Sequence, residues 1–445
     1  MVGMLVPDDR WSSETMSARR IIFRYLLLIG LAANLALLGL LVVWSIAKVQ
    51  RSDMYKDLRR SWMGPLDGVQ VEPIVPAAPG TINPSLVGLP AKRWIKIHEQ
   101  RTDDPHSFDR QVHSGAAFDP VRGRLMLFGS DTHRVNWDNQ VRFFDMAALA
   151  WSGSYLADDP DTYDVNADGV PVAGAAGNHP WAMHTFDAVE YDPIGDRLIV
   201  ASHPEHLHPG KSWGMSADVW RRIKRHPTWV YRVAENRWEY LPGKAVSFFP
   251  YATTFDPIRR VVIGVKPDGY WELDGEPLEW KRVAKGAPQA WHVAAAYDWH
   301  REIVVAFGTH TREDSVWQYR RGDDNGRRMP TPGLRPPGAD SAPLVYHPGA
   351  RRVVALVEER GLEGQGRTGT WLYDTAEDRW SRLETGDLPF QIGMNYHMVY
   401  DPGHELLVLV ANMPGEPVAV WVMRLPSSQQ SHTDTDQRNS SGKSG

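Results

Sequence analysis

The chain has 445 residues, of which 42% are hydrophobic and none is cysteine, and its formal net charge is −5. This length allows one large or two modest globular domains, and the lack of cysteine excludes disulfide scaffolds, thiol catalysis and cysteine metal sites. The 49 basic residues do not outnumber the 54 acidic ones, which argues against a nucleic-acid-binding protein, because such proteins usually carry a strong basic excess.

An apolar stretch follows the short N-terminal tail of residues 1–24. Residues 25–47 carry no charge over 23 positions, which corresponds to about 35 Å of helix and is enough to cross a bilayer core. The stretch is longer than the apolar part of a cleaved signal peptide, so we expect a single-pass transmembrane helix that anchors the chain in the cell membrane. Basic residues on both sides leave the orientation open, but large domains translocate largely regardless of charge. Together with the lack of cysteine, this favours an extracytoplasmic (periplasmic) domain.

Two further segments flank the expected globular domain of residues 92–426. Residues 48–91 are rich in Pro and Gly, a composition that disfavours helix and central strand and predicts a semi-extended linker. Residues 427–445 contain no apolar side chain, so we expect a disordered C-terminal tail.

The domain contains a sequence unit that occurs six times. The unit is an aromatic residue, Asp or His, usually Pro, a short polar turn and an aliphatic run, as in FDPVRGRLMLFG and YDPIGDRLIVAS. Asp caps the turn, Pro fixes its φ angle and the aliphatic run is typical of a buried strand, so each copy predicts a β-hairpin. The copies begin at Phe118, Tyr191, Phe255, Tyr297, Tyr346 and Tyr400.

A second hairpin with a Trp in its last strand follows most copies, most clearly in WVYRVAENRWEYL and WLYDTAEDRWSRL. Four strands per unit, at separations of 42 to 73 residues, match the blades of a β-propeller. The last unit lacks its Trp strand, whereas residues 93–97 supply a lone one before the first unit. We therefore expect an all-β, six-bladed β-propeller that is closed by an N-terminal strand.

The Tyr and Trp spacing of this pattern resembles the kelch-repeat family, in which these two residues close each blade. The resemblance covers residues 94–425 and implies the same propeller fold. The sequence departs from the family because it lacks the double glycine after the second strand, of which Gly129 and Gly308 remain, and because the fourth unit has no closing Trp.

The histidines gather on one face of the expected propeller. We define the bottom as the face that carries the turns after the first and third strand of each blade, and the top face as the opposite one. Four histidines precede their anchor aromatic by three, five or seven residues, so their side chains should share one face of the first strands. Their heights differ by up to about 13 Å, which argues against one four-histidine metal centre. They are His113, His184, His292 and His397.

The second unit contains the densest group of candidate metal ligands. His203, Glu205, His206 and His208 lie within six residues, and imidazole with carboxylate suits zinc, copper or iron. The alternative is that these side chains pack and hydrogen-bond with one another and with water. Further side chains of the expected ligand face are Trp137, Trp181, Trp213, Trp291, His133 and His310.

A possible calcium site lies in the sequence DVNADG. Asp164, Asn166 and Asp168 alternate as oxygen ligands before Gly169, as at the start of a calcium-binding loop. The twelfth position is Ala175, where an acidic ligand would be expected. A plain Asx-rich turn explains the same residues.

No phosphate loop, nucleophile elbow or dinucleotide fingerprint is visible in the sequence. Two functions from different classes remain. The preferred one is a membrane-anchored binding module whose top face docks a protein partner or a glycan, within or beside a larger membrane complex. The alternative is a metal-dependent enzyme, oxidative or hydrolytic, that uses the histidines of the top face.

Overall fold

The computed structural model describes residues 81–101, 113–130, 132, 137–340, 342–360, 366–385, 388, 396–411 and 417–426. The chain divides into two compact units, residues 1–70 and 71–445, and all described residues belong to the second. Within these residues no helix is long and apolar enough to cross a membrane. The predicted transmembrane helix at 25–47, most of the predicted linker and the predicted tail at 427–445 lie outside the described residues.

The described part is an all-β fold of 27 strands in seven antiparallel sheets, consistent with a β-propeller. Six sheets have four strands each. The first three are β2 (Gly115–Asp119), β3 (Arg124–Phe128), β4 (Arg142–Asp145) and β5 (Ala150–Gly153); β9 (Val189–Asp192), β10 (Arg197–Val200), β11 (Trp229–Arg232) and β12 (Arg237–Tyr240); and β13 (Ala252–Asp256), β14 (Val261–Lys266), β15 (Gly269–Asp274) and β16 (Glu279–Ala284).

The remaining three four-stranded sheets follow in chain order. They are β17 (Ala294–Asp298), β18 (Ile303–Phe307), β19 (Val316–Arg320) and β20 (Arg327–Arg328); β21 (Leu344–His347), β22 (Arg352–Arg360), β23 (Gly366–Asp374) and β24 (Arg379–Leu383); and β25 (His397–Asp401), β26 (Leu406–Ala411) and β27 (Ala419–Arg424) with β1 (Ile95–Glu99). Strand β1 pairs antiparallel with β27, which confirms the expected closure by an N-terminal strand. The fourth sheet, whose sequence lacks a closing Trp, ends in a strand of only two residues.

The repeats do not predict the seventh sheet, which lies in the connection between the first two four-stranded sheets. It consists of β6 (Asp164–Val165), β7 (Pro171–Ala173) and β8 (His179–Pro180). The described helices are short: α3 (Pro84–Val87), α4 (Ala217–Arg221) and the 3₁₀ turns η1 (Pro160–Thr162) and η2 (Glu205–Leu207). Residues of this connection and of the one between β10 and β11 share a small core that includes Tyr163, Trp181 and Leu207.

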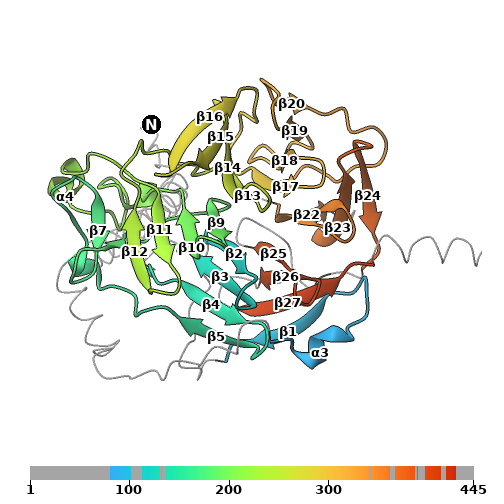
Figure 1. Cartoon of the computed structure of the whole chain (residues 1–445), viewed down its shortest axis with the longest axis horizontal. Helices are drawn as coiled ribbons and strands as arrows, with labels where there is room; N and C mark the ends of the chain where they lie inside the picture. The colour runs from blue at the N-terminus through green and yellow to red at the C-terminus, as the bar shows by residue number, and fades with distance from the viewer. Residues whose placement is uncertain are drawn as a thin grey trace, which may run out of the picture. The chain divides into compact units, whose positions relative to one another are not determined.

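The first strands of the six four-stranded sheets contact one another in a closed cycle. Strand β2 contacts β9, β9 contacts β13, and the contacts continue through β17, β21 and β25 back to β2. The second strands are almost wholly buried and form the cores between neighbouring sheets. Figure 1 shows the first strands innermost, with the other strands of each sheet outside them.

The turn after each first strand is built on one side chain. Asp119 Oδ1 accepts hydrogen bonds from the backbone N–H groups of Val121 and Arg122, at 3.0 and 3.1 Å. Asp192, Asp256, Asp298 and Asp401 accept equivalent bonds, as the Asp-Pro pattern predicts. In the fifth sheet His347 takes this position, and its Nδ1 accepts a hydrogen bond from the N–H of Ala350.

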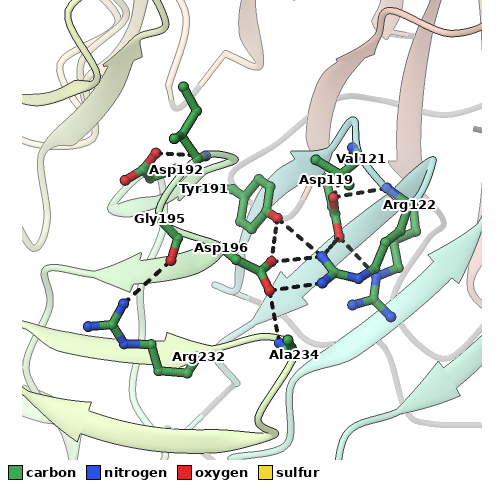
Figure 2. A network of polar contacts seen from close by, with 11 residues as sticks. Asp119, Val121, Arg122, Tyr191, Asp192, Gly195, Asp196, Arg232 and Ala234 are labelled. Carbon is green, nitrogen blue, oxygen red and sulfur yellow. Dashed lines mark hydrogen bonds and ion pairs between the residues drawn. The ribbon is translucent and has the colours of Figure 1, made fainter. Parts of the chain in front are cut away.

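The same turns also join neighbouring sheets. Arg122 forms a bidentate pair with Asp196 of the second sheet, at 2.7 and 2.8 Å, and contacts the carboxylate of Asp119 at 2.9 Å. Its Nη1 also lies 3.3 Å from the hydroxyl of Tyr191, which donates to Asp196 (Figure 2). Burial raises the pKa of Tyr191 above its usual range, and the charge of Asp119 adds to the effect. The anchor aromatic and the turn of the repeat thus form a joint between sheets.

Residues N-terminal to Lys92 already belong to this packing. Asn83 caps helix α3 through its side chain, Pro84 occupies the first helical position, and Leu86 is buried. The N–H of Asn83 donates to Nε2 of His404, and its side-chain amide donates to the carbonyl of Ala147. The segment predicted as a linker is therefore attached to the bottom turns of the sixth and first sheets at its C-terminal end.

Candidate functional site

The top face carries a continuous group of imidazole and aromatic rings, which we call the histidine–aromatic cluster. Every member lies in a top connection or immediately before a first strand, so the cluster faces away from the bottom turns. Its members are His113, His184, Phe186, His206, Phe249, Trp291, His292 and His310.

Three histidines form the buried side of the cluster. The ring of His184 lies between those of His113 and His206, with centroid distances of 4.3 and 4.1 Å and interplanar angles of 22° and 32°. His184 is only 1% exposed. Helix η2 presents His206, so the stack joins the first sheet to the connection between β10 and β11.

Phe186 links the two halves of the cluster. Its ring lies 5.0 Å from His113, and it stacks on Phe249 at 5.5 Å and on His292 at 5.1 Å. His113 and His292 thus both contact Phe186, a residue that the sequence analysis did not select.

Three members of the cluster have left-handed backbone conformations. The φ angles are +65° at His113, +45° at Phe186 and +60° at His292. Such conformations cost about 1–2 kcal/mol for residues other than glycine, and they persist only where the surrounding structure enforces them. Left-handed residues also occur in the bottom turns, as at Asp196 and Arg260, so the cluster is a functional candidate because of its exposed aromatic ring and polar neighbours rather than its backbone conformation.

The solvent-exposed end of the cluster is a tryptophan whose backbone is hydrogen-bonded to His310. Trp291 is 53% exposed, and its ring lies over that of His310 at 4.6 Å. The backbone N–H of Trp291 donates to Nδ1 of His310, and the backbone N–H of His310 donates to the backbone carbonyl of Trp291. Beside this pair, Nδ1 of His292 lies 2.9 Å from a carboxylate oxygen of Asp340. The result is an exposed aromatic platform next to a carboxylate and imidazoles.

A second histidine group borders Phe249. Nδ1 of His203 lies 2.7 Å from the hydroxyl of Ser247, and its Nε2 lies 3.3 Å from Glu205. Burial lowers the pKa of His203 although Glu205 opposes the shift. Burial also lowers the pKa of His226 to about 4, with a further contribution from His203. Both imidazoles are therefore neutral near neutral pH, and His226 was not selected from the sequence.

Three of the four histidines expected on the first strands lie outside those strands. The side-chain alternation from which we placed all four on one strand face therefore does not apply to these three. Only His397 lies within its strand, where Nε2 is 3.0 Å from the hydroxyl of Ser114. His113 and His292 precede their strands by two residues with positive φ, and His184 lies five residues before β9. Alternation of side chains requires continuous extended backbone, which ends before these positions.

The predicted metal ligands do not converge in the described part of the chain. His203 bonds Ser247, His206 stacks on His184, and His208 contacts the edge of Trp220 at 5.1 Å. Among the residues that the structure describes, no group of three or more His, Asp or Glu side chains is placed to hold a metal ion. Metal bonds lie in the plane of an imidazole, so near-parallel stacked rings cannot direct nitrogens at one ion.

The expected ligand-face tryptophans differ in accessibility. Trp181 is completely buried and donates to the carbonyl of Val172, so it packs the core of the seventh sheet rather than a ligand. Trp137 contacts Tyr163 in the same core and is half-buried, as is Trp213. His133 lies outside the described residues. Trp291 alone among these tryptophans is exposed.

The candidate calcium loop is the turn between β6 and β7. Asn166 Oδ1 accepts hydrogen bonds from the N–H groups of Asp168 and Val170, both at 3.0 Å. Asp168 accepts a bond from the hydroxyl of Tyr240, and Asp164 pairs with Arg222. The oxygens are thus engaged in an Asx turn and in side-chain contacts, which is the alternative that the sequence left open.

Two carboxyl groups in and just before strand β9 are also buried, those of Glu190 and Asp187. Asp187 accepts a bond from the N–H of Ala295 at 2.8 Å, and Glu190 accepts one from the hydroxyl of Thr253 at 3.3 Å. Burial raises the pKa of both carboxyl groups, and the charge of Asp187 raises that of Glu190 further. Each bond joins the second sheet to another sheet, which gives both residues a structural role.

A scan against protein-family models finds no match for this chain. A search of the curated proteins finds no match either.

Proposed function

We propose that this protein is a binding module built on a six-bladed β-propeller. Six four-stranded sheets, the closed cycle of their first strands and the six sequence repeats support six blades. The three-stranded sheet then is an insertion between the first two blades, consistent with its separate core. The kelch-like Tyr and Trp spacing remains a resemblance.

We further propose that residues 25–47 anchor the chain in the cell membrane with the propeller on the extracytoplasmic side. The support is the uncharged length of this stretch and the lack of cysteine in a chain of 445 residues.

The observation that carries the binding function is the platform of Trp291 over His310. Exposed aromatic side chains have few rotatable bonds and bury a large area on binding, so they dominate many binding surfaces. The neighbouring His292–Asp340 pair offers hydrogen-bonding groups at the same place. Because these groups suit ligand hydroxyls, a glycan is the first ligand class to test, and a protein partner is the second.

The test is a binding comparison with the full-length chain in detergent. We would screen it on a glycan array and, in parallel, cross-link it in intact membranes through a photoreactive residue at position 291. For any ligand found, Trp291→Ala should weaken binding by at least about tenfold without changing the thermal midpoint, as for a central contact residue. Ile258→Ala is the control, since Ile258 is a 72% exposed apolar residue in the turn after strand β13, on the bottom face. A ligand that binds both variants equally well would refute the platform as the contact.

A further inference from the structure

The bottom turns carry an unusual set of exposed aliphatic residues. The residue after Asp-Pro is Val121 in the first sheet, Ile194 in the second and Ile258 in the third. These side chains are 46%, 64% and 72% exposed. The equivalent positions of the fourth, fifth and sixth sheets hold His300, Gly349 and Gly403. Apolar exposure is thus confined to one side of the bottom face.

The N-terminal segment extends this set to the sixth sheet. Ile82 is 41% exposed, and its Cδ1 lies 3.4 Å from the position that a Cβ on Gly403 would take. Ile82 therefore covers the turn whose own residue is glycine. Four neighbouring turns, those of the sixth, first, second and third sheets, each present one aliphatic side chain. We call Ile82, Val121, Ile194 and Ile258 the aliphatic arc.

Ion pairs between turns keep these side chains next to one another. Arg122, which follows Val121, pairs with Asp196 in the turn of Ile194 (Figure 2). Arg260 in the turn of Ile258 lies 3.8 Å from Asp192. The arc is therefore presented by a rigid row of turns rather than by independent loops.

The chain itself indicates what lies opposite the arc. Thr81 is the first described residue, and the segment that follows it is attached to the bottom turns through His404 and Ala147. Upstream, 33 residues separate this segment from the uncharged stretch 25–47. The described part of the chain thus begins at the bottom turns, on the face that exposes the arc.

We propose that the aliphatic arc rests in the head-group region of the lipid bilayer. Interfacial binding by exposed apolar side chains scales with the apolar area buried, and it adds to the effect of a covalent or transmembrane anchor. In this arrangement the bottom face lies against the membrane and the histidine–aromatic cluster faces away from it. The inference uses the proposed anchor but does not depend on the ligand of the top face.

The lack of cysteine makes a direct test simple, because each introduced cysteine is a unique labelling site. The full-length chain would be reconstituted in phosphatidylcholine–phosphatidylglycerol vesicles after labelling of Val121→Cys, Ile194→Cys or Ile258→Cys with an environment-sensitive fluorophore. Leu156→Cys is the matched control: Leu156 is 52% exposed and follows strand β5 at the top. Co-flotation with the vesicles shows that the chain is membrane-bound.

We expect head-group nitroxide lipids to quench the three arc labels at least about twofold more strongly than the Leu156→Cys label, and iodide to quench them less. If iodide quenches the arc labels and nitroxide lipids do not, the proposal is overturned. Labels protected from both quenchers would indicate that a protein or a second copy covers the arc, which also overturns it. A chain that does not float with the vesicles overturns both this proposal and the anchor, whereas the Trp291 comparison tests the top face separately.

Discussion

His347 holds the turn position that aspartate occupies in the other five repeats, and this exchange should make the protein sensitive to acid. The side chain is 3% exposed. Its Nδ1 accepts a hydrogen bond from the N–H of Ala350 at 3.1 Å, which requires the neutral ring. Burial lowers the pKa of His347 from 6.5 to about 4, and the positive charge of Arg424 contributes to this shift.

The direction of the effect follows from proton binding. Because the folded-state pKa is lowered, the unfolded chain binds a proton as pH falls below 6.5, and the folded chain does not until pH reaches about 4. The stability contribution is present above pH 6.5 and is lost progressively toward pH 4. Lowering the pH from about 7 to about 5 should therefore reduce the free energy of unfolding by about 2 kcal/mol through His347 alone.

His347→Asp restores the residue found in the other turns and provides the test. Arg352, which pairs with Asp374, lies five residues later, as Arg124 does relative to Asp119, so a guanidinium lies near the new carboxylate. Urea unfolding of the full-length chain in detergent, followed by tryptophan fluorescence, should show that the variant loses about 2 kcal/mol less than the wild type over this pH range. The exposed His208→Asp is the control, and His226 contributes equally to every protein compared. Equal pH dependence of His347→Asp and wild type would refute the reasoning.

Two further predictions concern the joint between sheets and the metal hypothesis. Arg122→Ala should lower the free energy of unfolding by about 2 kcal/mol, because it leaves the buried Asp119 with one fewer cation and removes a bidentate pair. Arg122→Lys should recover part of this loss. If Arg122→Ala loses no more stability than the exposed Arg237→Ala in the same denaturation assay, the prediction is contradicted. Elemental analysis of the full-length chain, purified without chelator, should show no stoichiometric zinc, copper or iron; one equivalent that disappears in a His203, His206 and His208 triple alanine variant would instead revive the metal-dependent enzyme.

The regular half of the molecule was predictable because its sequence obeys local rules. An aromatic residue followed by Asp and Pro determines a capped turn, and the aliphatic run after it determines a buried strand. Strands β9 and β10 around Tyr191 follow this rule, and the missing Trp of the fourth repeat is matched by the short strand β20. The closing role of β1 followed from counting Trp strands.

The top face was less predictable because its connections have no period. His113 and His292 lie at positive φ, so extrapolating the alternation of a strand to them fails. Phe186 and Phe249 have no special sequence context, and only the fold brings them between the histidines. Trp181 was expected to face a ligand, but the long connection around it forms its own sheet and core, where the indole is buried.

The bottom and top faces therefore differ in the kind of side-chain contacts that they make. At the bottom, aspartates, arginines and tyrosines repeat from sheet to sheet, and each contact satisfies a buried group, as at Asp119 and Arg122. At the top, the stacked imidazoles of His113 and His184 and the exposed ring of Trp291 lie in connections that the sheets hold in place. Left-handed backbone occurs on both faces, as at Asp196 and Arg260 in the bottom turns, so the exposed aromatic ring rather than the backbone conformation distinguishes the top face. The exposed Trp291, adjacent to the strained His292, is accordingly the first place where a bound ligand should be sought.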